Sequence, residues 1–366
     1  MQITFLVGNG FDISLGLQSS YSSFNKWYCN LDSDKKHILD FRKEIKDDIK
    51  NGGRNWSDFE RALGKYTKNF TIETVDQFID CYEDAHQSLL RYLETEKSRF
   101  DFNISEECID LFRNSLLHYN DELTPRDKKT IENEYLQDRL STRFKFLSFN
   151  YTNCLDLFVA GSSNTPLKQW KYGATPLSIS VDPIVTHVHG MIEQFPVFGV
   201  NDESQILNKD FLSNAQFKRI MIKPTCVEEI GQLWHDEAKS EIEKSHIICV
   251  FGMSIGETDT IWFERIMNWL QADNNRHLIV YWHTDDPANS QSIVRWTQNQ
   301  RKVQVKLTDY TALSNEQIDN LNKRIHVVEN TKIVFPMKLQ FNANYLKQRE
   351  KENITEAVNK IQVAKA

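Results

Sequence analysis

Short apolar runs that alternate with helix-like stretches constrain the fold of this chain most. Most of the runs are continuously apolar, which is typical of strands buried on both faces of a sheet. Helical periodicity separates several of them, as in residues 258–272 and 289–300. This alternation predicts an α/β fold with a mostly parallel sheet. The expected strands are ITFLV (3–7), FKFLSF (144–149), IVTHVH (184–189), PVFGV (196–200), HIICVFG (246–252), HLIVYWH (277–283) and VQVKL (303–307).

Residues 20 to 140 differ from the rest of the chain. They are rich in charged residues, and apolar side chains such as Phe78, Tyr82 and Leu89 recur at helical spacing. This pattern predicts a large helical insertion between the first two strands. The expected parts are a nucleotide-binding domain (1–30 plus 140–310), the helical insertion (31–139), and a C-terminal strand with an amphipathic helix (311–366).

Composition narrows the class of protein. A net charge of −7 argues against nucleic-acid binding. The six cysteines include no C-x-x-C pair, which argues against a disulfide framework or a zinc site and suits a reducing compartment. No segment resembles a signal peptide or a membrane span. We therefore expect a cytoplasmic protein without a membrane partner and without a metal.

The first candidate site is the turn Gly8-Asn9-Gly10, which follows the first expected strand. Glycines after a buried strand bring backbone N–H groups close to a phosphate. Ile13 stands where a dinucleotide-binding fingerprint has its third glycine, so the motif is weak and a simple tight turn remains an alternative. Asp12 either meets a ligand or only favours the N-terminus of the following helix.

A polar cluster, Asn150-Tyr151-Thr152-Asn153, follows the second expected strand. Ligand-binding residues of open α/β sheets gather at the carboxyl ends of strands. The structural alternative is that Thr152 or Asn153 caps a helix while Asn150 turns the chain.

Two histidines, His187 and His189, alternate along another expected strand and so should face opposite sides. His189 stands beside a glycine at the strand end and is the better candidate for a general base, although a lone histidine is often structural.

A third loop, with Gly252, Ser254 and Gly256, leads into a helix opened by Thr258 and Asp259. The backbone amides of this loop could bind a phosphate or a sugar. The structural alternative is that Thr258 or Asp259 caps the helix.

These segments together resemble the AbiH family of bacteriophage abortive-infection proteins. The resemblance rests on "GNGFDISLGLQSSYSSF", "WSDFE" (56–60), "SFNYTNCLD", "HVHG", "FGVND" (198–202) and "FGMSIGETD", and it spans about residues 3 to 270. Within "WSDFE", Glu60 follows Trp56 by one helical turn and could project from the insertion into a site.

The same series of motifs is similar, more distantly, to the sirtuin-like nucleotide-binding pattern, which implies a Rossmann-like core that binds NAD. It implies that the glycine turn holds the NAD phosphates and that Asn150 and His189 flank the nicotinamide ribose. No zinc-binding cysteine quartet is present, which favours NAD hydrolysis over deacylation. The implied cofactor-binding set is Gly8, Asn9, Gly10, Phe11, Tyr151, Thr152, Gly252, Ser254 and Asp259.

We therefore expect an antiphage effector that hydrolyses NAD, as its substrate, or a related nucleotide. Asn150 would position water or ribose, His189 would act as the base, and Asp12 or Asp259 would steady the cationic intermediate. The alternative is a nucleotide sensor that binds without cleavage and acts through a partner. A phage-derived trigger is expected, and a homo-oligomer remains open.

Overall fold

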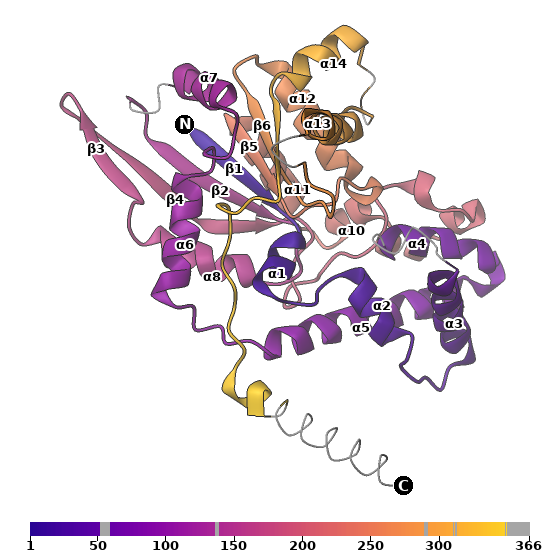
Figure 1. The fold of residues 1–366 in the computed structure, drawn as a ribbon. Helices are drawn as coiled ribbons and strands as arrows, with labels where there is room; N and C mark the ends of the chain where they lie inside the picture. Colours follow the sequence, from indigo (N-terminus) through magenta and orange to yellow (C-terminus); the bar gives the residue numbers. More distant parts are fainter. Residues whose placement is uncertain are drawn as a thin grey trace.

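The computed structural model describes residues 1–51, 59–135, 139–288, 292–309, 311, 313–347 and 349. Its centre is one seven-stranded sheet with the order β3-β4-β2-β1-β5-β6-β7 (Figure 1). All neighbouring strands are parallel except β3, which pairs with β4 in an antiparallel hairpin at the edge. The strands are β1 (Gln2–Val7), β2 (Thr142–Ser148), β3 (Lys168–Tyr172), β4 (Thr175–His187), β5 (Ile247–Phe251), β6 (His277–Trp282) and β7 (Ile325–Glu329).

The central strands are buried on both faces, as their continuous apolar sequences predict. In β1, Ile3, Phe5 and Val7 point to one face of the sheet, while Leu6 points to the other, because side chains alternate along a strand. The predicted α/β fold with a mostly parallel sheet is confirmed.

Helices cover both faces of the sheet. One face packs against α1 (Gly10–Leu15), α6 (Glu106–Leu117), α7 (Pro125–Tyr135) and α8 (Cys154–Ser163). The other face packs against α11 (Trp234–Lys244), α12 (Thr260–Ala272), α13 (Ile293–Thr308) and α14 (Asn315–Asn322). The result is a three-layer α/β/α core.

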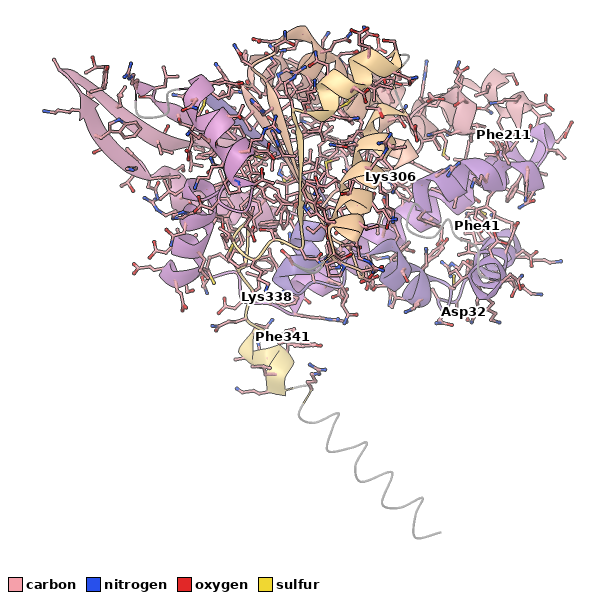
Figure 2. All side chains as sticks on the ribbon, turned by 45° about the horizontal axis from the view of Figure 1, so that its top comes forward. Asp32, Phe41, Phe211, Lys306, Lys338 and Phe341 are labelled. Carbon is pink, nitrogen blue, oxygen red and sulfur yellow. The ribbon has the colours of Figure 1, made fainter. Side chains whose placement is uncertain are left out.

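The segment between β1 and β2 is helical, but its helices serve two different cores. The helices α1, α6 and α7 cover the sheet itself. The remaining four form a second hydrophobic cluster with α9 (Ala215–Met221) and neighbouring residues, in which Figure 2 labels Phe41 and Phe211. These four are α2 (Tyr21–Tyr28), α3 (Lys36–Lys50), α4 (Phe59–Tyr66) and α5 (Val75–Ser98).

After β7 the chain crosses the sheet face that carries α1, and we call residues 330–342 the C-terminal strap (Figures 1 and 2). Phe335 inserts its ring between Phe11, Phe112 and Phe251, with ring centroids 5.0 to 5.4 Å apart. Lys338 donates from Nζ to the Ser14 carbonyl over 2.5 Å. The strap therefore holds α1 against the sheet.

Two expected strands are wrong. Residues 303–307 belong to α13, where Val303 and Leu307 lie one helical turn apart and are fully buried. A spacing of four residues is about one helical turn, so this short apolar run fits a helix as well as a strand. Residues 196–200 form no strand, and only Val200 makes an isolated bridge to Ile222.

The predicted C-terminal strand corresponds to β7. The expected C-terminal amphipathic helix lies mostly outside the described residues, and so does Trp56. The helix expected over 258–272 is α12, whereas the one expected over 289–300 corresponds to α13, although residues 289–291 lie outside the described part of the chain. The proposed domain boundaries stay predictions.

Candidate functional site

A cavity of about 1060 Å³ lies at the carboxyl ends of the parallel strands. It spans the point between β1 and β5 where the strand order reverses, because β2 lies on one side of β1 and β5 on the other. Ligands of open α/β sheets bind at such switch points. Every residue of the predicted site lines this cavity except Phe11, whose ring is buried against Phe158, Phe251 and Phe335.

The glycine turn packs directly on the loop after β5. A Cβ atom on Gly10 would lie 2.5 Å from the Gly252 Cα, and Gly252 itself has a φ of +67°. Both residues therefore need to be glycine so that the two backbones can touch.

The amides of this turn are already engaged. Gly8 donates to the Phe251 carbonyl, Gly10 to the Gly252 carbonyl, and Phe11 back to Gly8. The Asn9 side chain is tied to Ser19 at both its atoms. The expectation that the Gly8, Gly10 and Phe11 amides hold a phosphate is thus not supported, because their N–H groups already donate to backbone carbonyls of the turn itself and of the end of β5.

Asp12 is 1% exposed and accepts two side-chain hydrogen bonds from the end of β2. Asn150 donates from Nδ2 to Oδ1 over 3.1 Å, and Thr152 donates from Oγ1 to Oδ2 over 2.5 Å. Burial raises the pKa of Asp12 to about 6, against the opposing effect of these two hydrogen bonds. Thr152 therefore serves Asp12 rather than capping α8, and Asn153 makes no side-chain cap either.

The bond to Asp12 sets the orientation of the Asn150 amide. Since Nδ2 faces Asp12, Oδ1 is left as a buried acceptor without a hydrogen-bond partner among the described residues. A buried acceptor of this kind is costly to the fold unless a ligand or a water satisfies it.

His189 is the second residue that carries such an acceptor. Its Nε2 lies 3.2 Å from Asp259 Oδ1, whereas its Nδ1 is buried and has no hydrogen-bond partner in the described part of the chain. Burial, together with the nearby Lys223 ammonium, lowers the pKa of His189. The imidazole is neutral at pH 7, and Nε2–H donates to Asp259, which leaves the lone pair on Nδ1.

His187 is placed differently, as the alternation along the strand predicts. Its Nε2 lies 2.9 Å from Asp156, its Nδ1 lies 3.3 Å from the Asn150 carbonyl, and it is not among the cavity-lining residues.

Asp259 forms part of an ion-pair network. It stands at the N-cap position of α12, at the end of the short 3-10 turn η6 (Glu257–Asp259), but its side chain makes no capping bond. Burial favours a raised pKa, but the Lys223 ammonium, 3.6 Å away, and the hydrogen bond from His189 outweigh it and bring the pKa of Asp259 to about 2. The carboxylate is therefore ionised at neutral pH.

Glu60 reaches the cavity from α4, and it pairs with a lysine. Its Oε2 lies 2.5 Å from Nζ of Lys223, the first residue of α10 (Lys223–Glu229). Its Oε1 accepts hydrogen bonds from the hydroxyls of Tyr21 and Tyr151, over 2.8 and 2.7 Å. The helical segment thus contributes a charged wall to the cavity.

The comparison with protein families covers most of the chain. Residues 4–281 match the family model described as bacteriophage abortive infection AbiH. The chain belongs to the AbiH family. No curated protein matches the chain significantly in sequence. This AbiH protein is thus an abortive-infection antiphage protein, and its sirtuin-like character stays a prediction.

The matched region of this AbiH protein contains the glycine turn, Asn150, His189 and Asp259, but it ends inside β6. One side of the cavity lies beyond it. This side is lined by Trp282, the last residue of β6, and by residues that follow β6 and β7: His283, Asn330, Thr331, Val334, Phe335, Pro336 and Lys338.

Within the described ranges of this AbiH protein, no three His, Cys, Asp or Glu side chains are arranged to hold a metal ion. None of the described helices is both long and apolar enough to cross a membrane.

Lys223 is one of the cavity residues that the sequence reasoning missed. It stands in the run KRIMIKP (218–224), which resembles an ordinary exposed basic stretch. Only its 4% exposure and its two carboxylate partners, from distant parts of the AbiH chain, distinguish it. No local pattern could have revealed these contacts.

Proposed function

We propose that this AbiH protein hydrolyses NAD, or a closely related dinucleotide, at its N-glycosidic bond. The observation that carries the proposal is the pair of buried, unpartnered acceptors, Asn150 Oδ1 and His189 Nδ1. They stand on neighbouring strand ends, because β2 pairs with β4 with Ser148 opposite His187. The hydroxyls of a ribose, or an attacking water, would donate to both.

The extent of the cavity supports a dinucleotide. His189 follows β4 and Trp282 ends β6, and three strands lie between β4 and β6. With neighbouring strands about 4.8 Å apart, the two residues are separated by roughly 19 Å along the sheet edge. This span suits an extended dinucleotide better than a mononucleotide.

The end of the cavity near Trp282 has the chemistry that a second nucleotide needs. The Trp282 indole offers a surface for a base. Lys338 brings an ammonium to the cavity wall from the C-terminal strap, where its Nζ donates to the Ser14 carbonyl. Phosphates are therefore assigned to this end rather than to the amides of the glycine turn.

In the proposed reaction the bond between C1′ of the ribose and the nicotinamide nitrogen breaks. Its electron pair neutralises the pyridinium and releases nicotinamide. Water adds to C1′, and His189 Nδ1 takes the proton that the water loses, giving ADP-ribose. Asn150 Oδ1 orients the water or the adjacent ribose hydroxyl. The ionised Asp259 fixes the His189 tautomer and stabilises the imidazolium that forms.

Asp12 takes a supporting part in this proposal. Both of its oxygens are occupied by Asn150 and Thr152, so it orients Asn150 rather than meeting the substrate. Depletion of the nucleotide would arrest the infected cell, and a phage-derived trigger would release the activity.

The direct test incubates purified full-length protein with NAD and measures nicotinamide release, with and without lysate from phage-infected cells. We expect cleavage by the wild-type protein and a loss of about 10²-fold or more in His189→Ala. His118→Ala, a change at an exposed histidine that is not a cavity-lining residue, controls for the substitution itself. Tight NAD binding without turnover would instead indicate a nucleotide sensor. No cleavage under any condition, with intact phage defence by His189→Ala, would refute the proposal.

A further inference from the structure

We propose that Lys223 is a positioning residue that keeps the His189–Asp259 pair in its working charge state, and that Glu60 holds Lys223 in place. The inference rests on the proposed function only in giving His189 the role of base. It adds Lys223 from α10 to the site and gives Glu60 of α4, which the sequence analysis named as a candidate, the role of holding Lys223.

Lys223 is a buried cation between two carboxylates. Its side chain is 4% exposed, and Nζ lies 2.5 Å from Glu60 Oε2 and 3.6 Å from Asp259 Oδ1. Burying an ammonium is costly unless opposite charges compensate it. Two carboxylates from separate elements supply that compensation here.

Asp259 Oδ1 is shared between Lys223 and His189. The same oxygen lies 3.6 Å from the Lys223 ammonium and 3.2 Å from the imidazole Nε2. Any change in the charge of Lys223 is therefore felt by the imidazole both directly and through the carboxylate that it contacts.

Glu60 is in turn fixed by two tyrosines. The Tyr21 and Tyr151 hydroxyls both donate to Oε1, which leaves Oε2 for Lys223. Tyr21 begins α2 and Glu60 stands in α4, whereas Tyr151 follows β2. The position of Lys223 thus depends on the packing of the helical segment against the sheet.

The charges around His189 predict that Lys223 and Glu60 shift the pKa of His189 in opposite directions. The groups that face it are Asp259 from η6, Lys223 from α10, Glu60 from α4 and His235 from α11. Lys223 adds to burial in lowering the pKa of His189, whereas the carboxylates of Asp259 and Glu60 raise it. If the ion pair between Glu60 and Lys223 served only to join α4 to α10, its removal would not have to change the pKa of His189.

The experiment measures the pKa of His189 by NMR titration of the histidine rings in full-length protein. The His189 resonance is assigned by its loss in His189→Asn. We expect Lys223→Met to raise this pKa by about one pH unit and Glu60→Gln to lower it, while Lys223→Arg stays close to the wild type. A loss of packing alone would not shift the pKa of His189 in opposite directions in Lys223→Met and Glu60→Gln.

The inference is overturned if Lys223→Met and Glu60→Gln leave the His189 titration unchanged, or shift it in the same direction. Should Lys223→Met fail to fold, the nearly isosteric Glu60→Gln decides: a lowered pKa supports the inference and an unchanged one refutes it. The titration needs no substrate, so its outcome is independent of whether NAD is cleaved.

Discussion

The Asn150 side chain donates from Nδ2 to the Asp12 carboxylate over 3.1 Å, although 138 residues separate the two in sequence. This bond joins the ends of β1 and β2, the first two strands of the sheet in sequence. It leaves the Asn150 carbonyl oxygen buried and without a hydrogen-bond partner among the described residues. Asp12, which follows the glycine turn, therefore has its partner within the protein.

Asp12→Asn should change how stability depends on pH. The pKa of Asp12 is about 6 in the folded protein against 3.8 for an ordinary aspartate, so the folded state binds this proton more tightly. Its contribution to the free energy of unfolding is therefore fully present below about pH 4 and lost as pH rises to about 6, a change of about 3 kcal/mol. Asp12→Asn should remove this slope, as urea unfolding at pH 4.5, 5.5 and 7 would show.

The exposed Asp110 offers a matched control, because Asp110→Asn removes a carboxylate from a helix surface and should leave the slope as in the wild type. Equal pH dependence in Asp12→Asn and the wild type would contradict the prediction.

Asn150→Ala should lower kcat for nicotinamide release by about 10²-fold and change KM little, because its amide oxygen is proposed to act on the attacking water. Steady-state kinetics with NAD would measure both constants. Asn153→Ala is the control, since Asn153 belongs to the same motif but is not a cavity-lining residue. A rise in KM alone would point to a role in binding only.

Trp282→Ala should raise KM for NAD by roughly tenfold, the equivalent of one lost base-stacking contact. Nicotinamide mononucleotide lacks the adenylate half, so its cleavage should be unaffected. Trp296→Ala changes an exposed tryptophan on α13 and should affect neither substrate. An equal rise in KM for NAD and for nicotinamide mononucleotide would instead place Trp282 beside the nicotinamide half of the substrate.

Phe335→Ala should lower the free energy of unfolding by about 3–5 kcal/mol, because it empties a site in the middle of the aromatic core. Phe341→Ala, further along the strap, should cost far less, since Phe341 is 38% exposed and stacks on Phe100 near the surface. Thermal and urea unfolding of the two variants would compare them. Similar losses would mean that the strap is held along its whole length rather than at Phe335.

Much of the sheet could be predicted, because a strand buried on both faces is apolar throughout. β1, β5 and β6 have this character, and these three strands and β2 each lie within two residues of their expected bounds. The hairpin strand β3 (KQWKY) could not be found this way, because an edge strand has an exposed, polar sequence.

The residues of the candidate site also differ in whether the sequence could predict them. Residues at strand ends, such as Asn150 and His189, could be placed together because parallel strands bring their carboxyl ends to one edge. Lys223 could not, because its role depends on contacts with Glu60 and Asp259 that only the packed tertiary structure creates. The glycine turn resembled a ligand loop, yet its three donating amides meet protein carbonyls, a difference that no spacing of glycines reveals.

The C-terminal strap also has a consequence for protein synthesis. Phe335 and Lys338 are among the last described residues to leave the ribosome, and both line the cavity. A nascent chain that has already produced the glycine turn, Asn150, His189 and Asp259 still lacks this wall and part of the aromatic core beneath it. The cavity therefore gains this wall only after the residues of the glycine turn, Asn150, His189 and Asp259 have all been synthesised.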